Sequence, residues 1–560
     1  MSSVNPSPGR NREAWGTRIG VILAVTGGAV GLGNFLRFPG LAAKYEGGAF
    51  MVPYVTALLL LGLPLAWAEW ALGRYGGGRG FNSGPGIFRA LWPSRTAAYL
   101  GTLVLIVPVL VYMYYVFIEA WCLGYAWHMA TGQLDLGLEK SAYIDFFARF
   151  VGARQDGALF TSDGLSSLGF LAICLAANLW LIYRGLSKGI EWFCRWAMPA
   201  LVLCALAVLV RVLTLGTPDP AQPELNLLNG LGFMWNPRTE QVGFLQALAN
   251  PKMWIEAASQ IFFSVAIGFG IIITYASYLK PDDDIALSGL TSVAGNEFCE
   301  VALGGMITIP AAFIFLGRDG ALAIAGSTFD LGFKTLPMIF HSMPLGRAVG
   351  TLFFFLLFLA AVTSSIAMLQ PAIALFEEGL GLSRRRSVAL LGVMTLAGVG
   401  FVVYFTRNLV ALDTIDFWVG TLAIYLLATV QTILFGWFLG MRRGMEELDR
   451  GAEIRIPRLV GFVIKYVSPV YLLGVFALWL YQQITATEDN FFLAAARSPA
   501  ARGTVAFILA MCLTLLALVH LSLRRWERAE RGPSRLSRGR AATEGPSGAI
   551  PLPSESETSP

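Results

Sequence analysis

The chain has 560 residues, of which 56% are hydrophobic and only 14% are charged, and its formal net charge is +5. A mean hydropathy of +0.62 leaves too little charged surface for a water-soluble globular domain. The composition therefore excludes a soluble globule, no nucleic-acid partner is expected, and the surroundings of the protein are predicted to be a lipid bilayer.

A helix that spans a bilayer needs about 20 predominantly apolar residues. Twelve windows of the sequence meet this need, which predicts an all-α polytopic membrane protein with 12 transmembrane helices. The windows lie near residues 19–42, 50–73, 97–129, 166–184, 190–214, 252–278, 287–316, 346–377, 387–405, 414–440, 460–484 and 503–523.

The segments outside these windows predict the orientation. Residues 1–18 are polar and lack a signal-peptide cleavage pattern, so we interpret them as a cytoplasmic N-terminal segment. Basic residues concentrate in loops of one parity, for example at Arg384, Arg385 and Arg386 after the eighth window. By the positive-inside rule both termini are cytoplasmic, in the plasma (inner) membrane. The basic tail 526–560, rich in Ser, Pro and Gly, is expected to be disordered.

Cysteines and histidines give no sign of a metal or catalytic centre. No pair of cysteines has a C-x-x-C spacing, and three histidines are scattered along the chain, so neither a disulfide framework nor a metal site is predicted. A membrane enzyme is disfavoured, because the windows hold no cluster of His, Cys and carboxylate residues. The cysteines are Cys122, Cys174, Cys194, Cys204, Cys299 and Cys512, and the histidines are His128, His341 and His520.

The first window contains the run Gly27-Gly28-Ala29-Val30-Gly31-Leu32-Gly33-Asn34. Each glycine costs a helix roughly 1 kcal/mol relative to alanine, so the helix is expected to break there. At membrane depth, freed carbonyl groups can coordinate a cation and freed N–H groups can bind a carboxylate. The alternative is close helix packing through small residues. The amide of Asn34, directly after the glycines, favours an ion site.

The sixth window has the same unusual composition between Gln260 and Gly270. Interrupted spans at matching positions of two halves indicate a transporter site near the bilayer midplane. We therefore predict a transporter domain over 19–525, with helices 1 and 6 unwound at mid-membrane. Its inverted repeats would be spans 1–5 (about 19–214) and spans 6–10 (about 252–440), with spans 11 and 12 (about 460–523) appended.

Several motifs resemble one family. The run Trp15-Gly16-Thr17-Arg18, followed by GLGNFLRFP from Gly31 to Pro39, resembles the opening of the neurotransmitter:sodium symporter family, and in particular its bacterial leucine transporter. The likeness continues through Gly47 to Phe50, Asn296-Glu297 and Thr363-Ser364-Ser365, and it reaches about Arg525. It implies a sodium-coupled symporter that works by alternating access.

The resemblance also implies two sodium sites. Neutral oxygen ligands suit a hard monovalent cation, whereas carboxylate cages suit calcium. Taken singly, the amides could instead form interhelical hydrogen bonds, and the hydroxyls could bond back to their own helix. The first site would use Ala29, Asn34, Ser264, Asn296 and the substrate carboxylate; the second would use Gly27, Val30, Ala360, Thr363 and Ser364.

A substrate site and two gates are implied in the same way. The substrate residues would be Gly28, Ala29, Leu32, Gly33, Val111, Tyr115, Phe263, Ser264, Ala266, Phe269, Ser364 and Met368. Of these, the phenylalanines fit plain packing as well. Arg37 would pair with Asp416 above the site, and Arg12 would pair with Glu378 on the cytoplasmic side.

At several positions the chain departs from the family pattern, and these departures narrow the range of expected substrates. Amine transporters of the family have Asp where this chain has Gly31, so the ligand should bring its own carboxylate. Gly28 and Ala266 replace polar residues and make the pocket drier. We expect a neutral, hydrophobic L-amino acid, with a non-transporting amino-acid sensor of the same fold as the alternative. Glu300 stands where chloride-dependent members carry a small hydroxyl residue, which predicts two Na⁺ ions and no chloride requirement. An oligomer is possible.

Overall fold

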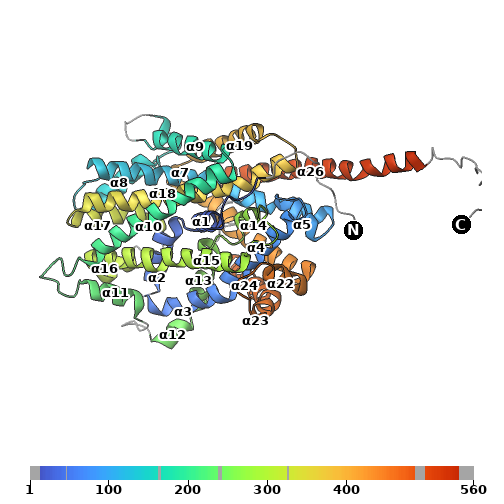
Figure 1. Cartoon of the computed structure of the whole chain (residues 1–560). Helices are drawn as coiled ribbons and strands as arrows, with labels where there is room; N and C mark the ends of the chain where they lie inside the picture. The colour runs from blue at the N-terminus through green and yellow to red at the C-terminus, as the bar shows by residue number, and fades with distance from the viewer. Residues whose placement is uncertain are drawn as a thin grey trace, which may run out of the picture.

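The computed structural model describes residues 13–45, 47–161, 166–236, 243–323, 327–485 and 498–541. Within these ranges every regular element is a helix, and none is a strand. The long helices run side by side along one bundle (Figure 1). α8 (Lys140–Phe150) and α17 (Leu336–Ser342) lie at one end of the bundle, and α5 (Gly84–Leu91) and α22 (Met441–Asp449) lie at the other.

Nine helical stretches in the described ranges are long and apolar enough to cross a membrane. A tenth is added when the bent pair Arg18–Ala29 and Gly33–Lys44 counts as one span. The nine are Gly48–Gly77, Arg95–Thr131, Leu186–Leu213, Ile285–Ala323, Gly346–Glu378, Arg384–Tyr404, Arg407–Asp449, Arg458–Tyr481 and Pro499–Glu530.

Two of the twelve predicted windows fall short of this length. The fourth window corresponds to α9 (Leu168–Tyr183), which has only 16 residues. The sixth is divided between α13 (Pro251–Ser264) and α14 (Ile271–Ala276), with non-helical residues between them. Both windows are helical where they were expected, but neither is one long helix.

The first span is broken at the glycine-rich run. α1 (Arg18–Ala29) begins at a cap in which the Thr17 side chain accepts a hydrogen bond from the Gly20 N–H, and it ends at Ala29. The next helical residues form η1 (Gly33–Arg37) and α2 (Phe38–Lys44), and the chain bends by 51° between the two segments. The carbonyl groups at the end of α1 therefore lack the helical N–H partners of a continuous span.

The break in the sixth window depends on left-handed backbone. Ala266, Gly268 and Gly270 have φ angles of 57°, 75° and 78°. A Cβ atom on Gly268 would lie 2.4 Å from the carbonyl oxygen of Ile424, so this position combines a positive φ with no room for a side chain. These residues separate the end of α13 from the start of α14.

The two broken spans lie between two groups of helices. α7 (Leu103–Thr131) and α10 (Trp192–Leu213) both pack on α18 (Gly346–Glu378), and α1 packs against α10 and α18. On its other side α1 contacts α15 (Ile285–Glu297), which packs on α4 (Leu63–Gly77). α13 and α14 pack on α3 (Gly48–Ala57) and α4, respectively, and α14 also contacts α18 of the first group.

The C-terminal helix is longer than expected. α26 (Pro499–Ala541) continues into the segment that was predicted to be disordered from residue 526. Its extension has partners: Glu527 pairs with Arg95 at 2.6 Å and Glu530 with Arg89 at 2.9 Å, while Trp526 packs edge-on against Phe81. Residues 542–560 lie outside the described residues, so disorder there stays a prediction.

Candidate ion and substrate site

The side chain of Asn34 joins the first broken span to α15. Its Oδ1 accepts a hydrogen bond from the Gly31 N–H at 2.8 Å, and its Nδ2 donates to Asn296 Oδ1 at 2.9 Å and to Glu300 Oε2 at 3.0 Å. Asn296 in turn donates to the Ser264 hydroxyl at 3.4 Å. Three residues predicted for the first sodium site, Asn34, Ser264 and Asn296, therefore form one buried cluster.

Glu300 belongs to the same cluster. It is fully buried in η5 (Phe298–Gly305), and its second oxygen accepts a hydrogen bond from Gln260 Nε2 at 2.8 Å. Both carboxylate oxygens thus have donors from the broken spans. This places a carboxyl group directly beside the proposed ligands of the first ion.

The second cluster forms where the end of α1 meets the middle of α18. The Ser364 hydroxyl lies 3.0 Å from the Ala360 carbonyl oxygen, 3.2 Å from that of Val30 and 3.4 Å from that of Gly27. Thr363 Oγ1 lies 3.0 Å from the Ala360 oxygen. All five residues predicted for the second sodium site are brought together. One hydroxyl proton serves a single acceptor at a time, so the convergent oxygens suit a cation.

Tyr115 and Phe263 close in on the break of the first span. The Tyr115 hydroxyl lies 3.5 Å from the Leu32 N–H, at the limit of a hydrogen bond. A Cβ atom on Gly31 would lie 2.8 Å from that hydroxyl, and one on Gly33 would lie 2.7 Å from the Phe263 ring. The two glycines allow this close approach, and a side chain at residue 31 would require the Tyr115 hydroxyl to move.

The remaining predicted pocket residues are buried nearby. The rings of Phe263 and Phe269 make an edge contact at 6.0 Å between centroids. A Cβ atom on Gly28 would lie 3.2 Å from Ala367 and 3.4 Å from Ile271, two residues that sequence reasoning missed. Val111, Ala266 and Met368 are also buried.

A cavity of about 320 Å³ borders this region. It reaches Leu32, Gly33, Tyr115 and Phe263, whereas Val111, Ala266, Phe269 and Met368 do not line it. Tyr115 and Phe263 therefore stand between the cavity and the predicted pocket. The rest of the cavity wall includes Arg37, Glu256, Ser259, Phe262, Asp413, Asp416, Phe476 and Trp479.

The predicted pairing of Arg37 with Asp416 is not formed in the structure, although both side chains line the cavity. Arg37 donates to the Ser259 hydroxyl at 3.0 Å, and its guanidinium lies 4.8 Å from the centre of the Phe263 ring. Asp416 accepts a hydrogen bond from the Tyr114 hydroxyl. Arg37 and Asp416 each have another polar partner, and both side chains face the cavity.

On the opposite side, Glu378 binds the start of α5. Its carboxylate accepts hydrogen bonds from the N–H groups of Asn82 and Ser83 at 2.5 and 2.9 Å and from the Ser83 hydroxyl at 3.0 Å. Arg12, its predicted partner, lies outside the described residues, so that pairing stays a prediction.

Two buried carboxylates that sequence reasoning missed hold the broken spans. Glu69 of α4 accepts a hydrogen bond from the Gly268 N–H at 2.8 Å, inside the break. Glu191 accepts from the N–H groups of Gly16 and Thr17 at 2.7 and 3.0 Å, just before α1. An ionisable residue within a span is a functional candidate by itself, and this signal would have found both.

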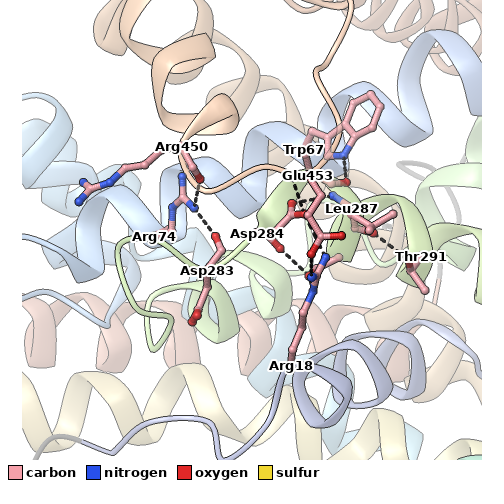
Figure 2. Close-up of polar contacts among 11 residues, drawn as sticks. Arg18, Trp67, Arg74, Asp283, Asp284, Leu287, Thr291, Arg450 and Glu453 are labelled. Carbon is pink, nitrogen blue, oxygen red and sulfur yellow. Dashed lines mark hydrogen bonds and ion pairs between the residues drawn. The ribbon is translucent and has the colours of Figure 1, made fainter.

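A polar network connects α1 and α4 with the segment before α15 and with the segment 447–453 (Figure 2). Arg18 of α1 pairs with Asp284 at 3.0 Å and also pairs with Glu453. The buried Arg74 of α4 pairs with Glu447 at 2.9 Å. It also donates to the carbonyl oxygens of Asp283 and Arg450 (Figure 2). The connection before α15 and the segment 447–453 are thus fixed to both helices.

These features define a class of protein. Two broken spans expose backbone oxygens inside a bundle of apolar helices, and the oxygens converge with buried hydroxyl and amide groups. Such an arrangement is typical of ion-coupled membrane transporters. In the described part of the chain, no three His, Cys, Asp or Glu side chains are grouped so that they could hold a metal ion.

Comparison with known families agrees with this class. The sequence model of the sodium:neurotransmitter symporter family matches residues 12–145 and 136–528, and the chain belongs to this family. The family consists of transporters rather than enzymes, and the resemblance found in the sequence is confirmed.

Known relatives cover most of the chain. An uncharacterized sodium-dependent transporter of Methanocaldococcus jannaschii is 27% identical over 476 residues, which are 83% of this chain and 89% of the relative. The mouse sodium- and chloride-dependent transporter XTRP3A is 25% identical over 616 residues, covering 93% of this chain and 99% of the relative. The crystal structure of MhsT in complex with L-phenylalanine has a TM-score of 0.69 and 29% identity, and the match covers 83% of this chain and 99% of that one.

Proposed function

We propose that this sodium-dependent symporter imports a neutral, hydrophobic L-amino acid together with two sodium ions. The observation that carries the proposal is the convergence of oxygens at the breaks of both spans: the Asn34, Ser264 and Asn296 cluster on one side and the Ser364 cluster on the other. These groups are neutral and buried, as a monovalent cation without its water shell requires.

The substrate is proposed to be a zwitterion because Gly31, next to the Tyr115 hydroxyl, supplies no protein carboxylate to balance a substrate amine. The substrate carboxylate would bind the N–H groups of Leu32 and Gly33 and the Tyr115 hydroxyl, and it would complete the shell of the first sodium ion. Each ligand would then raise the affinity of the other by the same factor. The apolar neighbours of Gly28, together with the L-phenylalanine bound by MhsT, support a hydrophobic side chain.

Glu300 is proposed to replace chloride. It lies within hydrogen-bonding distance of Asn34, where a mobile anion would balance the charge of the first sodium ion. The mouse relative is named as sodium- and chloride-dependent, so chloride independence would separate this chain from that relative.

Alternating access would use the two breaks as hinges. In this proposal the chain has 12 transmembrane helices with both termini in the cytoplasm, and spans 1–5 and 6–10 form an inverted repeat. Spans 1, 2, 6 and 7 would rock against the remaining helices. The position of α1 and α13–α14 between two helix groups supports this division.

Uptake by proteoliposomes tests the proposal. Purified protein should accumulate radiolabelled hydrophobic amino acids when sodium is higher outside, and not when sodium is equal on both sides. Each tenfold sodium gradient supplies about 1.4 kcal/mol per ion. Replacement of chloride by gluconate should leave uptake unchanged. Sodium-dependent binding without any uptake would instead indicate a sensor, and a chloride requirement would contradict the role of Glu300.

A further inference from the structure

A separate buried carboxyl group lies in the middle of α7, outside both oxygen clusters. Glu119 is fully buried, as are Asn178 of α9 and Ser365 of α18, whose side chains reach the same carboxyl group. Asn178 Nδ2 donates to Glu119 Oε2 at 3.0 Å. Among the described residues, no Lys, Arg or His lies close enough to neutralise Glu119.

Glu119 Oε1 and Asn178 Oδ1 receive no hydrogen bond of normal geometry, and the Ser365 hydroxyl, which lies near the carboxyl group, makes none either. A buried acceptor left without a donor costs about 1–3 kcal/mol, and an unpaired buried charge costs more. The carboxylate of Glu300 differs, because donors from Asn34 and Gln260 reach both of its oxygens.

The Ser365 hydroxyl has a single O–H, and when it turns toward Glu119 the oxygen Asn178 Oδ1 still lacks a donor, which a proton on Glu119 would supply. A protonated carboxyl group has one O–H donor and keeps an acceptor oxygen. In a pair between a carboxylic acid and a primary amide, the amide N–H donates to one acid oxygen while the acid O–H donates to the amide oxygen. Asn178 already supplies the first of these two bonds to Glu119. The second needs a proton on Oε1, and it would satisfy Oε1 and Oδ1 together.

We propose that Glu119 carries a proton and that, with Asn178 and Ser365, it forms a buried proton-binding site between α7, α9 and α18. An alkali ion fits this cluster less well than a proton, because the amide N–H of Asn178 points at the carboxyl group and few oxygens remain to surround an ion.

The groups around Glu119 support a neutral site. The titratable side chains that face it are Tyr112 and Cys122 of α7 and Cys174 of α9, with Tyr115 one helical turn before it. Phenol and thiol groups are uncharged near pH 7 in water. α18 contributes Ser365, and α19 (Arg384–Tyr404), which also packs on α7 and α9, contributes no titratable partner to Glu119.

The position of the site links it to transport. Tyr115 precedes Glu119 by one turn of α7, and Ser364 directly precedes Ser365 on α18. Loss of the proton would place a negative charge behind the proposed substrate carboxylate and the second sodium site. This link rests on the proposed function, whereas the proton site itself does not, and the tests below need no transport.

Infrared spectroscopy of the purified full-length protein detects the proton directly. The difference spectrum between wild type and Glu119→Gln at neutral pH should contain the carbonyl band of one protonated carboxylic acid. The exposed Glu139→Gln provides the matched control and should show no such band. A carboxylate band in place of the acid band for Glu119 would overturn the proposal.

Thermal unfolding in detergent tests whether the proton on Glu119 stabilises the folded protein. Glutamine keeps the neutral shape of the acid, so Glu119→Gln should melt close to wild type at neutral pH, whereas Glu119→Ala should melt several degrees lower. Because the unfolded chain releases the proton that the folded protein holds, rising pH should favour unfolding of wild type by about tenfold per pH unit relative to Glu119→Gln. Equal melting of the Gln and Ala variants at every pH would contradict the proposal.

The same melting experiment without alkali ions distinguishes a bound proton from a bound alkali ion. Exchange of sodium and potassium for N-methylglucamine should lower the melting temperature of wild type and Glu119→Gln by the same amount, since both retain the two proposed sodium sites. A larger decrease in wild type would show that an alkali ion occupies the Glu119 cluster, and the proton assignment would be wrong.

Discussion

At the scale of single residues, Asn34 connects the broken backbone of the first span to the proposed first ion site. Its oxygen holds the Gly31 N–H, which fixes the turn at the break, and its amide nitrogen reaches Asn296 and Glu300 in another helix. The same side chain therefore shapes the broken backbone and brings three polar groups to one point. Few other residues offer an acceptor and two donors on so short a stem.

Replacement of Asn34 by alanine should weaken sodium binding. Hydrogen bonds to charged groups contribute about 1.5–3 kcal/mol, so the sodium concentration for half-maximal amino-acid binding should rise roughly 10- to 100-fold. Binding of a radiolabelled hydrophobic amino acid to purified protein, titrated with sodium, measures this shift. The exposed Asn229→Ala is the matched control. An unchanged sodium titration in Asn34→Ala would exclude the residue from the first ion site.

At the scale of elements, the break between α13 and α14 depends on glycine. At Gly268 the φ angle of 75° and the Ile424 oxygen, 2.4 Å from a hypothetical Cβ, both exclude a side chain. The N–H of this glycine is also the group held by Glu69. The backbone conformation of the break and its hydrogen bond to α4 thus both depend on Gly268.

The variant Gly268→Ala should be destabilised by roughly 1–3 kcal/mol, because left-handed strain adds to the close contact. It should also lose sodium-dependent binding, since the Ser264 end of α13 would shift. The control is Gly400→Ala, in the helix α19, where a Cβ atom would meet nothing within 4 Å and stability should stay equal or rise. Melting temperatures in detergent decide the comparison, and equal values for both variants would contradict the proposed constraint.

The positions of the helices could be predicted from the sequence more accurately than the contacts between distant residues. The glycine run predicted the position where α1 ends, because helix propensity is local. The contacts of Arg37 with Ser259 and of Glu69 with Gly268 join residues more than 190 positions apart, and no local pattern reveals such pairs. The extension of α26 was missed for the same reason. Its composition favours disorder, but Arg89 and Arg95 supply partners from the other end of the chain.

At the scale of the whole molecule, transport should respond to voltage. The proposed cargo of two sodium ions and a zwitterion carries two positive charges, and each charge moved inward gains about 2.3 kcal/mol per 100 mV. Proteoliposomes given an inside-negative potassium diffusion potential should therefore accumulate more amino acid than liposomes without one. Dissipation of the potential by an ionophore should remove the difference. Uptake that ignores the potential would contradict the import of two net charges per substrate.

The contacts of α26 with Arg89 and Arg95 have a consequence for biosynthesis. The ribosome produces α26 after the other described helices, so Arg89 of α5 and the following Arg95 lack these partners until the rest of the bundle has been inserted. Exposed ion pairs contribute little, typically below about 1 kcal/mol each, and they weaken in salt. The end of α26 thus docks late and is held weakly. A chain that stops soon after residue 525 should still complete its assembly.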